Sequence, residues 1–470
     1  MAYIASIGKL FGDGGLQDIL SSSGVFASSS TASLLQGKHY ARGLRAIKIA
    51  YEAMMHLFLA AAASYAKAND LPWLDDETMK RIQDLDVAIQ ERDEDVLKTT
   101  FVDVSRRVTG VMETICKFKE HGRKQSSTFA FWESFLEAGN TLLRLLRADR
   151  EANFQLHLDA VLEAIPFFHL AGRVNYARYT PVYVSEMKSL ETAQPDMFQH
   201  LMNGGFVVRR KQETTFNCVP TDQALEQTIN REAKSDGGII GFTLRKGALL
   251  RWLLTRHITG EYAERYKEMC LSNPQSRQHE ELGHARMITD LNNVKQVRDY
   301  ILNHCQDPFD LSDVPEKLIN IVSGQVASAA VEKSLASLLS TGKALYQGFV
   351  DERLVEGKEK IKGIWDALPR KTALTFADMK KNVTNDKGKK ITMNTEVLFR
   401  RLLAVSQNRE VDLKKVLAFE LAAVPPSMFH DDGALRKTNK EGRPGEEDRV
   451  GLRRANRTST VQWQRYSLHH

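Results

Sequence analysis

Apolar side chains at three- and four-residue intervals are the feature of this sequence that most restricts its fold. In residues 39–67, the apolar positions with this spacing are Leu44, Ile47, Tyr51, Met54, Met55 and Phe58. Such spacing puts them on one face of an α-helix, and the Asn-Asp-Leu-Pro sequence at 69–72 ends it. Similar periodicity recurs up to residue 430. The sequence therefore predicts a mainly α, multi-helical protein.

One short region favours extended chain instead. Residues 206–210 and 214–219 are rich in Val, Thr and Phe, and a few polar residues separate them. These residue types are enriched in β-strands. We therefore predict at most a small β-hairpin near 205–219, with a helix beginning after Pro220.

Breaks in the helical periodicity suggest how the chain is organised. Its 470 residues are enough for two to four domains. Polar, breaker-rich residues at 121–128 give a first boundary, and 271–283 resemble a linker. The predicted parts are an N-terminal helical region (1–128), a central helical region (129–270), a C-terminal helical region (271–430) and a disordered tail (431–470).

Prolines and tyrosines punctuate the central region. Pro166 and Pro181 each predict a break or a kink in the chain that follows. Tyr176, Tyr179 and Tyr183 recur at helical steps between and after these prolines. We interpret the three tyrosines as packing residues that form an occasional hydroxyl hydrogen bond.

The charge balance permits nucleic-acid contact without arguing for it. The chain has 65 Lys and Arg against 59 Asp and Glu, a formal charge of +6 spread over 470 residues. Local basic groups are Arg209, Arg210 and Lys211, followed by Arg245 and Lys246. We take these five as candidate nucleic-acid-binding residues, although solvated surface charge explains them equally well.

Cysteine spacing and the N-terminus indicate the cellular setting. Cys116, Cys218, Cys270 and Cys305 are too widely spaced for a zinc motif or a disulfide framework, and free thiols fit a reducing compartment. The N-terminus lacks the charged and apolar regions of a secretory signal. The longest apolar run, 53–63, is too short to span a bilayer. We expect an intracellular protein, nuclear or cytoplasmic, without a membrane partner.

One acidic pattern could hold a metal. Asp222, Glu226 and Asn230 follow each other at four-residue spacing, after a helix entry at Pro220 and Thr221. On a helix they form one polar stripe, and oxygen ligands of this kind suit Mg²⁺. The same stripe could equally be the solvated face of an amphipathic helix. Both interpretations stay open at this point.

Other motifs for chemistry fail on spacing. His279 and His284 lie five residues apart, whereas zinc-binding helices need a separation of four. The glycine-rich residues 236–242 match neither a P-loop nor a dinucleotide-binding motif. No nucleophile elbow or kinase motif is present. We therefore expect no small-molecule cofactor.

Several blocks of the sequence resemble a known group of proteins. The blocks are 4–16, 35–43, 131–150, 175–179, 221–230, 237–243, 417–429 and 435–438. Together they resemble large, multi-copy, uncharacterised animal proteins associated with mobile elements, over most of residues 4–440. The resemblance suggests a transposase-like protein with an interrupted RNase H-like core. Such a core uses three acidic residues to hold two metal ions for phosphoryl transfer.

The resemblance implies roles for particular residues. Glu226, with Asp222, would be the retained catalytic and metal-binding acid, Mg²⁺ the cofactor of an active enzyme, and DNA the partner. The longer relatives extend beyond this chain at both ends, so we expect a truncated, catalytically inactive member that retains nucleic-acid binding. One alternative is a metal-dependent nuclease or transposase that uses Glu226 with further acids such as Glu133, Glu137 or Asp149. The other is a helical protein-interaction scaffold. The oligomeric state stays open.

Overall fold

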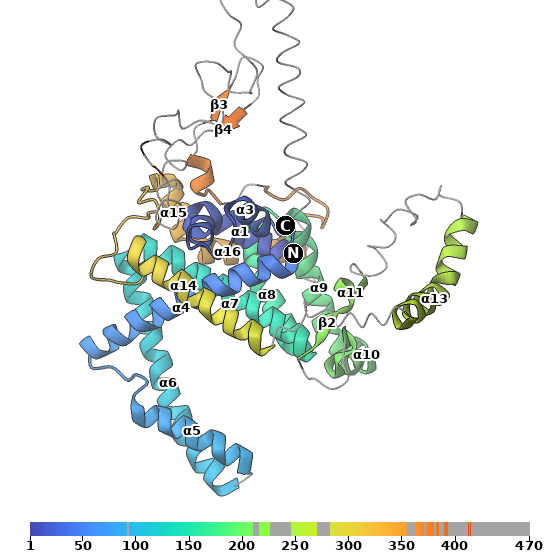
Figure 1. Cartoon of the computed structure of the whole chain (residues 1–470), viewed down its shortest axis with the longest axis horizontal. Helices are drawn as coiled ribbons and strands as arrows, with labels where there is room; N and C mark the ends of the chain where they lie inside the picture. The colour runs from blue at the N-terminus through green and yellow to red at the C-terminus, as the bar shows by residue number, and fades with distance from the viewer. Residues whose placement is uncertain are drawn as a thin grey trace, which may run out of the picture. The chain divides into compact units, whose positions relative to one another are not determined.

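The chain is mainly helical, as the sequence predicts. The computed structural model describes residues 1–91, 94–209, 216–225, 246–269, 283–354, 362–370, 373–379, 382–384, 390–392, 412 and 414. These residues form α-helices with two short pairs of antiparallel strands (Figure 1). Two compact units are present, Met1–Met379 and Lys380–His470. The predicted fold class is therefore confirmed.

Most of the described chain is a series of connected helices. The N-terminal helices are α1 (Ala2–Phe11), α2 (Gln17–Ser22), α3 (Ser28–Leu35), α4 (Tyr40–Ala68), α5 (Asp76–Glu91) and α6 (Glu94–Gln125). The next are α7 (Ser127–Glu151), α8 (Phe154–Leu170), α9 (Val174–Ala193), α10 (Pro195–His200), α11 (Thr221–Leu225) and α13 (Lys246–Met269). The last are α14 (His284–His304), α15 (Ala329–Ala336) and α16 (Leu338–Arg353). Shorter π and 3-10 turns are η1 (Gly12–Leu16), η2 (Leu201–Gly205) and η6 (Phe376–Met379).

The strands form two separate antiparallel pairs. β1 (Val207–Arg209) pairs with β2 (Cys218–Pro220), and Val208 lies opposite Val219. This pair lies where the sequence predicts a small β-hairpin. β3 (Asn382–Thr384) pairs with β4 (Lys390–Thr392) in the second unit, which the sequence pattern did not indicate.

Pro166 and Pro181 lie inside helices, and neither ends its helix. Pro166 belongs to α8 and Pro181 to α9, and both are buried. At Pro166, α16 approaches α8 so closely that a Cβ on Gly342 would lie 2.8 Å from the proline Cβ. Tertiary packing of this kind stabilises a helix that a proline alone would weaken.

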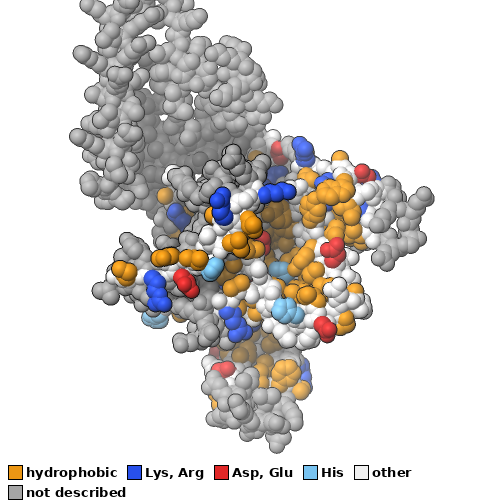
Figure 2. Space-filling model, turned by 90° about the vertical axis from the view of Figure 1, so that its right-hand side faces the viewer, with side chains coloured by type: hydrophobic (Ala, Val, Ile, Leu, Met, Phe, Trp, Pro, Cys, Tyr) orange, Lys and Arg blue, Asp and Glu red, His pale blue; other side chains and the backbone are white. Residues whose placement is uncertain are grey.

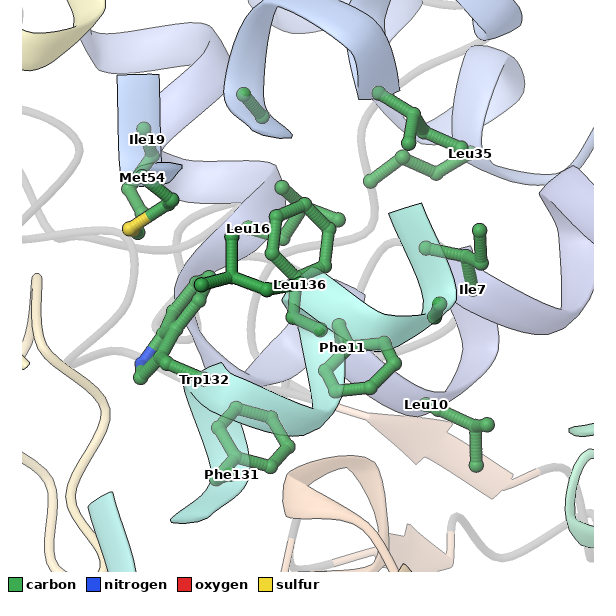
Figure 3. Close-up of a cluster of buried hydrophobic side chains, with 14 of the residues drawn as sticks. Ile7, Leu10, Phe11, Leu16, Ile19, Leu35, Met54, Phe131, Trp132 and Leu136 are labelled. Carbon is green, nitrogen blue, oxygen red and sulfur yellow. The ribbon is translucent and has the colours of Figure 1, made fainter. Parts of the chain in front are cut away.

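The core of the first unit surrounds α7. The ring centroids of Phe11 and Phe131 are 5.1 Å apart, those of Phe11 and Phe135 are 5.5 Å apart, and all three side chains are fully buried. Figure 3 shows Leu16 of η1 beside Trp132 of α7. Gly15 has a φ of 125° and lies against Trp132, so this turn needs a residue without a Cβ.

Helices from all three predicted helical regions contribute to this one core. Phe58 of α4, Phe129 of α7 and Phe309 pack against one another, with edge-to-face contacts of 5.3 and 5.5 Å to Phe309. Ser126 caps α7, since its Oγ accepts a hydrogen bond from Phe129 N–H, and it also donates to Pro315 O at 2.6 Å. Distant parts of Met1–Met379 are therefore joined around α7.

Among the described helices, α4 is the one whose length and composition would allow it to cross a membrane. Half of its apolar window is buried inside the protein. Its buried face includes Ile47, Ala50, Met54 and Phe58. This burial is what the core helix of a globular protein also shows.

We expect Phe11→Ala to lower the free energy of unfolding by about 3–5 kcal/mol, because it leaves a cavity among buried aromatic rings. Phe101→Ala is the matched control, since Phe101 is 56% exposed on α6, and it should cost less than about 1 kcal/mol. Chemical denaturation of both variants measures the difference. Equal losses would contradict this assignment of the core.

Candidate functional site

The predicted metal-binding stripe is represented by Asp222 alone. Asp222 is exposed in the first turn of α11. Thr221 anchors this helix, because its N–H and Oγ1 both donate to Phe206 O, at 3.2 and 2.9 Å. Glu226 and Asn230 lie outside the described residues. Within the described part of the chain, no group of three metal-ligating side chains is present, and the stripe stays a prediction.

The two predicted basic residues that the structure describes, Arg209 and Lys246, belong to separate elements. Arg209 is exposed at the end of β1, and Lys246 is exposed at the start of α13. Arg210, Lys211 and Arg245 lie outside the described residues. The grouping of these five residues as a nucleic-acid-binding set therefore stays a prediction.

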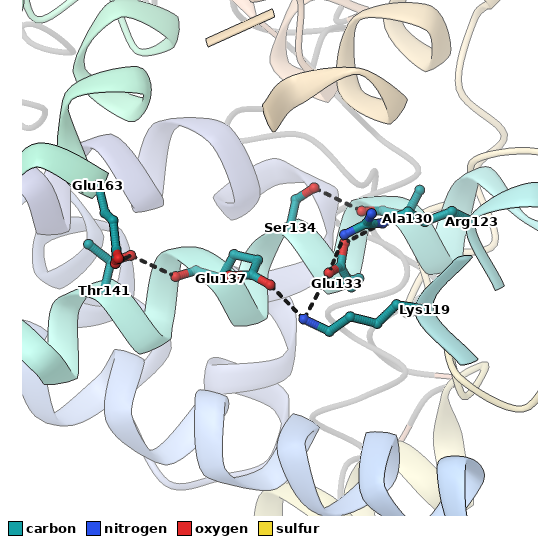
Figure 4. Close-up of polar contacts among 8 residues, drawn as sticks. All are labelled: Lys119, Arg123, Ala130, Glu133, Ser134, Glu137, Thr141 and Glu163. Atoms are coloured by element: carbon teal, nitrogen blue, oxygen red, sulfur yellow. Dashed lines mark hydrogen bonds and ion pairs between the residues drawn. The ribbon is translucent and has the colours of Figure 1, made fainter. Parts of the chain in front are cut away.

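Glu133 and Glu137 belong to a compact charge network between α6 and α7 (Figure 4). Glu133 is buried, and Arg123 donates to both of its carboxylate oxygens, at 3.0 and 2.6 Å. Lys119 Nζ lies 2.6 Å from Glu137 and 3.3 Å from Glu133. Burial alone would lower the pKa of Lys119, but the two carboxylates raise it. Both acids are therefore neutralised by cations of the protein itself.

Asp149 is also engaged, in a different network. Its Oδ1 lies 3.0 Å from His157 Nδ1, and His157 Nε2 lies 3.5 Å from the Tyr183 hydroxyl. Asp149 follows Glu137 by twelve residues on α7, about 18 Å along the helix axis. Two-metal sites hold their ions about 4 Å apart. Glu133, Glu137 and Asp149 therefore cannot share such a site.

A second region gathers candidate functional side chains that lie outside the predicted basic clusters. α8 ends at Leu170, and Gly172 turns the chain into α9 with a φ of 62°. A Cβ on Gly172 would lie 1.9 Å from Arg370 O, so glycine lets residues 362–370 cross this turn. We call the surface formed by this turn, the first turns of α9 and residues 362–370 the turn face.

Cationic side chains hold the turn face together. Lys9 Nζ donates to Ala171 O at 2.7 Å, and Arg173 donates to Ala5 O at 2.9 Å. Arg178 and Arg353 both donate to Asp366 O, each at 3.2 Å. Cations near the carboxyl end of α8 also interact favourably with its helix dipole.

These arginines are held by carbonyl groups. Among the described residues, Arg173, Arg178 and Arg353 form no ion pair within 4 Å, and their buried Nε–H groups have no hydrogen-bond partner. Lys362 is paired with Glu352 at 2.9 Å, and Arg370 is exposed. Asp366 accepts a hydrogen bond from Gly363 N–H. The turn face therefore has more cations than carboxylates.

Aromatic rings are exposed beside these cations. Trp365 is 73% exposed, Tyr176 50% and Tyr179 46%. The Arg178 guanidinium lies 5.8 Å from the Trp365 ring centroid, and the Tyr179 ring is 5.8 Å from it. The interpretation of the tyrosines as packing residues is thus incomplete for Tyr176 and Tyr179. Trp365 lies between Gly363 and Pro369, and a tryptophan in a loop is a signal that could have indicated this surface.

Exposed apolar side chains occur outside the turn face too. On α13, Leu250, Leu254 and Tyr262 are more than half exposed. Figure 2 shows one side of the molecule on which hydrophobic side chains reach the surface between cationic and acidic groups. The turn face differs from α13 because its aromatic rings contact a guanidinium and belong to packed elements.

His169 lies beneath the turn face and supplies a pH test. Burial and the nearby positive charge of Arg353 lower the pKa of His169 from 6.5 to about 4. Between these values only the unfolded chain takes up the proton, so stability falls as the pH drops from 6.5 to 4. This protonation should cost the unaltered protein about 2–3 kcal/mol of its free energy of unfolding between pH 6.5 and 4. In the His169→Gln variant we expect this part of the pH dependence to be absent. Unfolding measured across this range checks it, and identical pH dependence in both proteins would contradict it.

The metal hypothesis predicts saturable binding of Mg²⁺ or Mn²⁺ that Glu226→Ala abolishes, because a carboxylate ligand is lost. Asp222→Asn should weaken the same binding. Titration calorimetry of the two variants against the unaltered chain measures this, with Glu163→Gln as the control because Glu163 pairs with Arg144 on other helices. Absence of binding in every protein would make the stripe a solvated helix face.

Comparisons with known proteins give one match. No curated protein and no solved structure matches this chain. A family described as a domain of unknown function, DUF8702, matches residues 1–420. The matched part includes α1 to α16 and the whole turn face. Since it covers most of the sequence, the chain belongs to the DUF8702 family.

Proposed function

We propose that this chain binds nucleic acid through the turn face. The observation that carries the proposal is a set of arginines held by backbone carbonyls beside exposed aromatic rings. The resemblance to mobile-element proteins supports the same role, since such proteins act on nucleic acids. The proposal assigns no catalytic step to this face. It agrees with the predicted nuclear or cytoplasmic setting.

Carbonyl partners matter because they leave the positive charge of the arginine uncompensated. A hydrogen bond from a guanidinium to a carbonyl fixes the position of the side chain but does not neutralise its charge. Arg353 donates in this way to Gly363 O at 2.8 Å, and Arg178 to Asp366 O at 3.2 Å. The positive potential that remains attracts a polyanion, and phosphate groups suit both guanidinium and ammonium donors.

One further cation could reach a phosphate directly. Arg370 is exposed at one end of residues 362–370, whereas Lys362 at the other end is paired with Glu352 at 2.9 Å. Arg178 and Arg353 fix the backbone between them at Asp366. A strand along this segment would therefore meet the positive charge of Arg370 at one end of a loop that hydrogen bonds hold in place. Binding of this kind releases counterions and weakens as salt rises.

Charge reversal tests the proposal. We expect Arg370→Glu to weaken binding of a fluorescent 30-nucleotide DNA by about tenfold or more at low salt, since one favourable contact becomes repulsive. Arg370→Lys should retain most of the affinity. Anisotropy titrations at several salt concentrations measure both effects.

Lys67→Glu is the matched control, because Lys67 is an exposed cation on α4 away from the turn face. It changes the net charge by the same amount and should leave the affinity within about threefold. Equal weakening by the two charge reversals would show that only net charge matters. That result, or no binding to any nucleic acid, would overturn the proposal.

A further inference from the structure

We infer that the turn face selects single-stranded nucleic acid, whose unpaired bases stack on Trp365 and on the tyrosines of α9. This inference rests on the proposed function and names its substrate class. The evidence for it is the exposed aromatic rings and the side chains that hold them in place, whereas the evidence for the proposed function is the positive charge.

Trp365 presents a ring that is exposed but fixed in place. Its indole is 73% exposed. Arg178 donates to the carbonyl of the next residue, Asp366, and lies over the Trp365 ring. Tyr179 contacts the same ring nearly at right angles, with an interplanar angle of 76°. A ring held this way loses little conformational entropy when a ligand stacks on it.

Tyr176 and Tyr179 extend the aromatic surface along α9. They are three residues apart, so they lie on adjacent turns of one side of the helix. Tyr176 stacks on Phe168 of α8 with ring centroids 5.2 Å apart, and half of the tyrosine stays exposed. Phe168 in turn packs edge-on against Tyr3 of α1. The core thus supports the inner side of this tyrosine.

Rings with adjacent cations fit a single strand better than a duplex. Bases in a duplex are paired and stacked on one another, so an aromatic side chain cannot lie against their faces without opening the helix. An unpaired strand exposes its base faces, and each stacked base contributes about 1–3 kcal/mol. The flanking Arg370 is exposed and suited to the phosphates.

The experiment compares a single strand with a duplex. A labelled 20-nucleotide oligothymidylate and a 20-base-pair duplex are titrated with the full chain, with Trp365→Ala and with Trp365→Phe. We expect the single strand to bind more tightly than the duplex. Trp365→Ala should weaken single-strand binding by about 5- to 100-fold, Trp365→Phe should retain most of it, and duplex binding should change little.

Tyr262→Ala is the control, because Tyr262 is an aromatic residue 74% exposed on α13. It should leave both affinities unchanged. Circular dichroism checks that Trp365→Ala folds, as expected for so exposed a side chain.

The outcomes separate this inference from the proposed function. If Arg370→Glu weakens binding but Trp365→Ala does not, the nucleic-acid function stands and the stacking inference is wrong. Equal affinity for strand and duplex would also overturn the inference. If neither nucleic acid binds, both are wrong. Capture of a proline-rich peptide by the same rings, lost in Trp365→Ala and without nucleic-acid binding, would assign the face to a protein partner.

Discussion

Burial of the first half of α7 on nearly every side is the constraint on which the rest of the structure depends. Phe129, Phe131, Trp132 and Phe135 are all fully buried along this helix, so helices from before and after it in the sequence must pack around it. Beside these rings the helix cannot direct the side chain of Glu133 to water, although Arg147 in the last turns of α7 is exposed. Glu133 is therefore neutralised where it lies, by Arg123 and Lys119 of α6. Removing both partners would leave an unpaired buried charge, which is far more costly than an exposed one.

The same packing sets the position of the turn face. α8 packs along α7, and its carboxyl end is held against α1 by Lys9 and Arg173, which donate to backbone carbonyls on either side. Because α16 approaches Pro166 of α8 closely, Arg353 at the end of α16 reaches residues 362–370. The loop that carries Trp365 is therefore tied to the core by hydrogen bonds. An exposed ring on such a loop keeps a defined position, which recognition needs.

Local patterns predicted much of the fold but little of the turn face. Helical spacing predicted both ends of α4 to within one residue, and residue preferences predicted the region of β1 and β2. Both signals depend only on residues that are close together in the sequence. Pro166 suggested a break or kink, yet the helix continues because tertiary packing outweighs local preference. Spacing also cannot say which side of a helix is covered, so Tyr176 and Tyr179 were interpreted as packing residues. Arg178, Arg353 and Trp365 meet only through the tertiary path of the chain. The acidic stripe at Asp222 and Glu226 depends only on spacing along one helix, not on tertiary structure, and it stays a prediction.

The cations of this protein lie in two kinds of environment, one in which carboxylates compensate their charge and one in which carbonyl oxygens do not. Between α6 and α7, around the buried Glu133, Arg123 and Lys119 face carboxylates and the network is close to neutral. At the turn face, Arg178 and Arg353 face carbonyl oxygens instead. A carboxylate in place of Asp366 O would hold the same loop and also cancel the charge. Burying Arg353 without that compensation is unfavourable, and its hydrogen bonds to Gly363 O and Asp366 O offset part of this cost while they hold the loop. Under the proposed function, a polyanion at this surface would supply the missing negative charge, and the exposed rings would supply contact area.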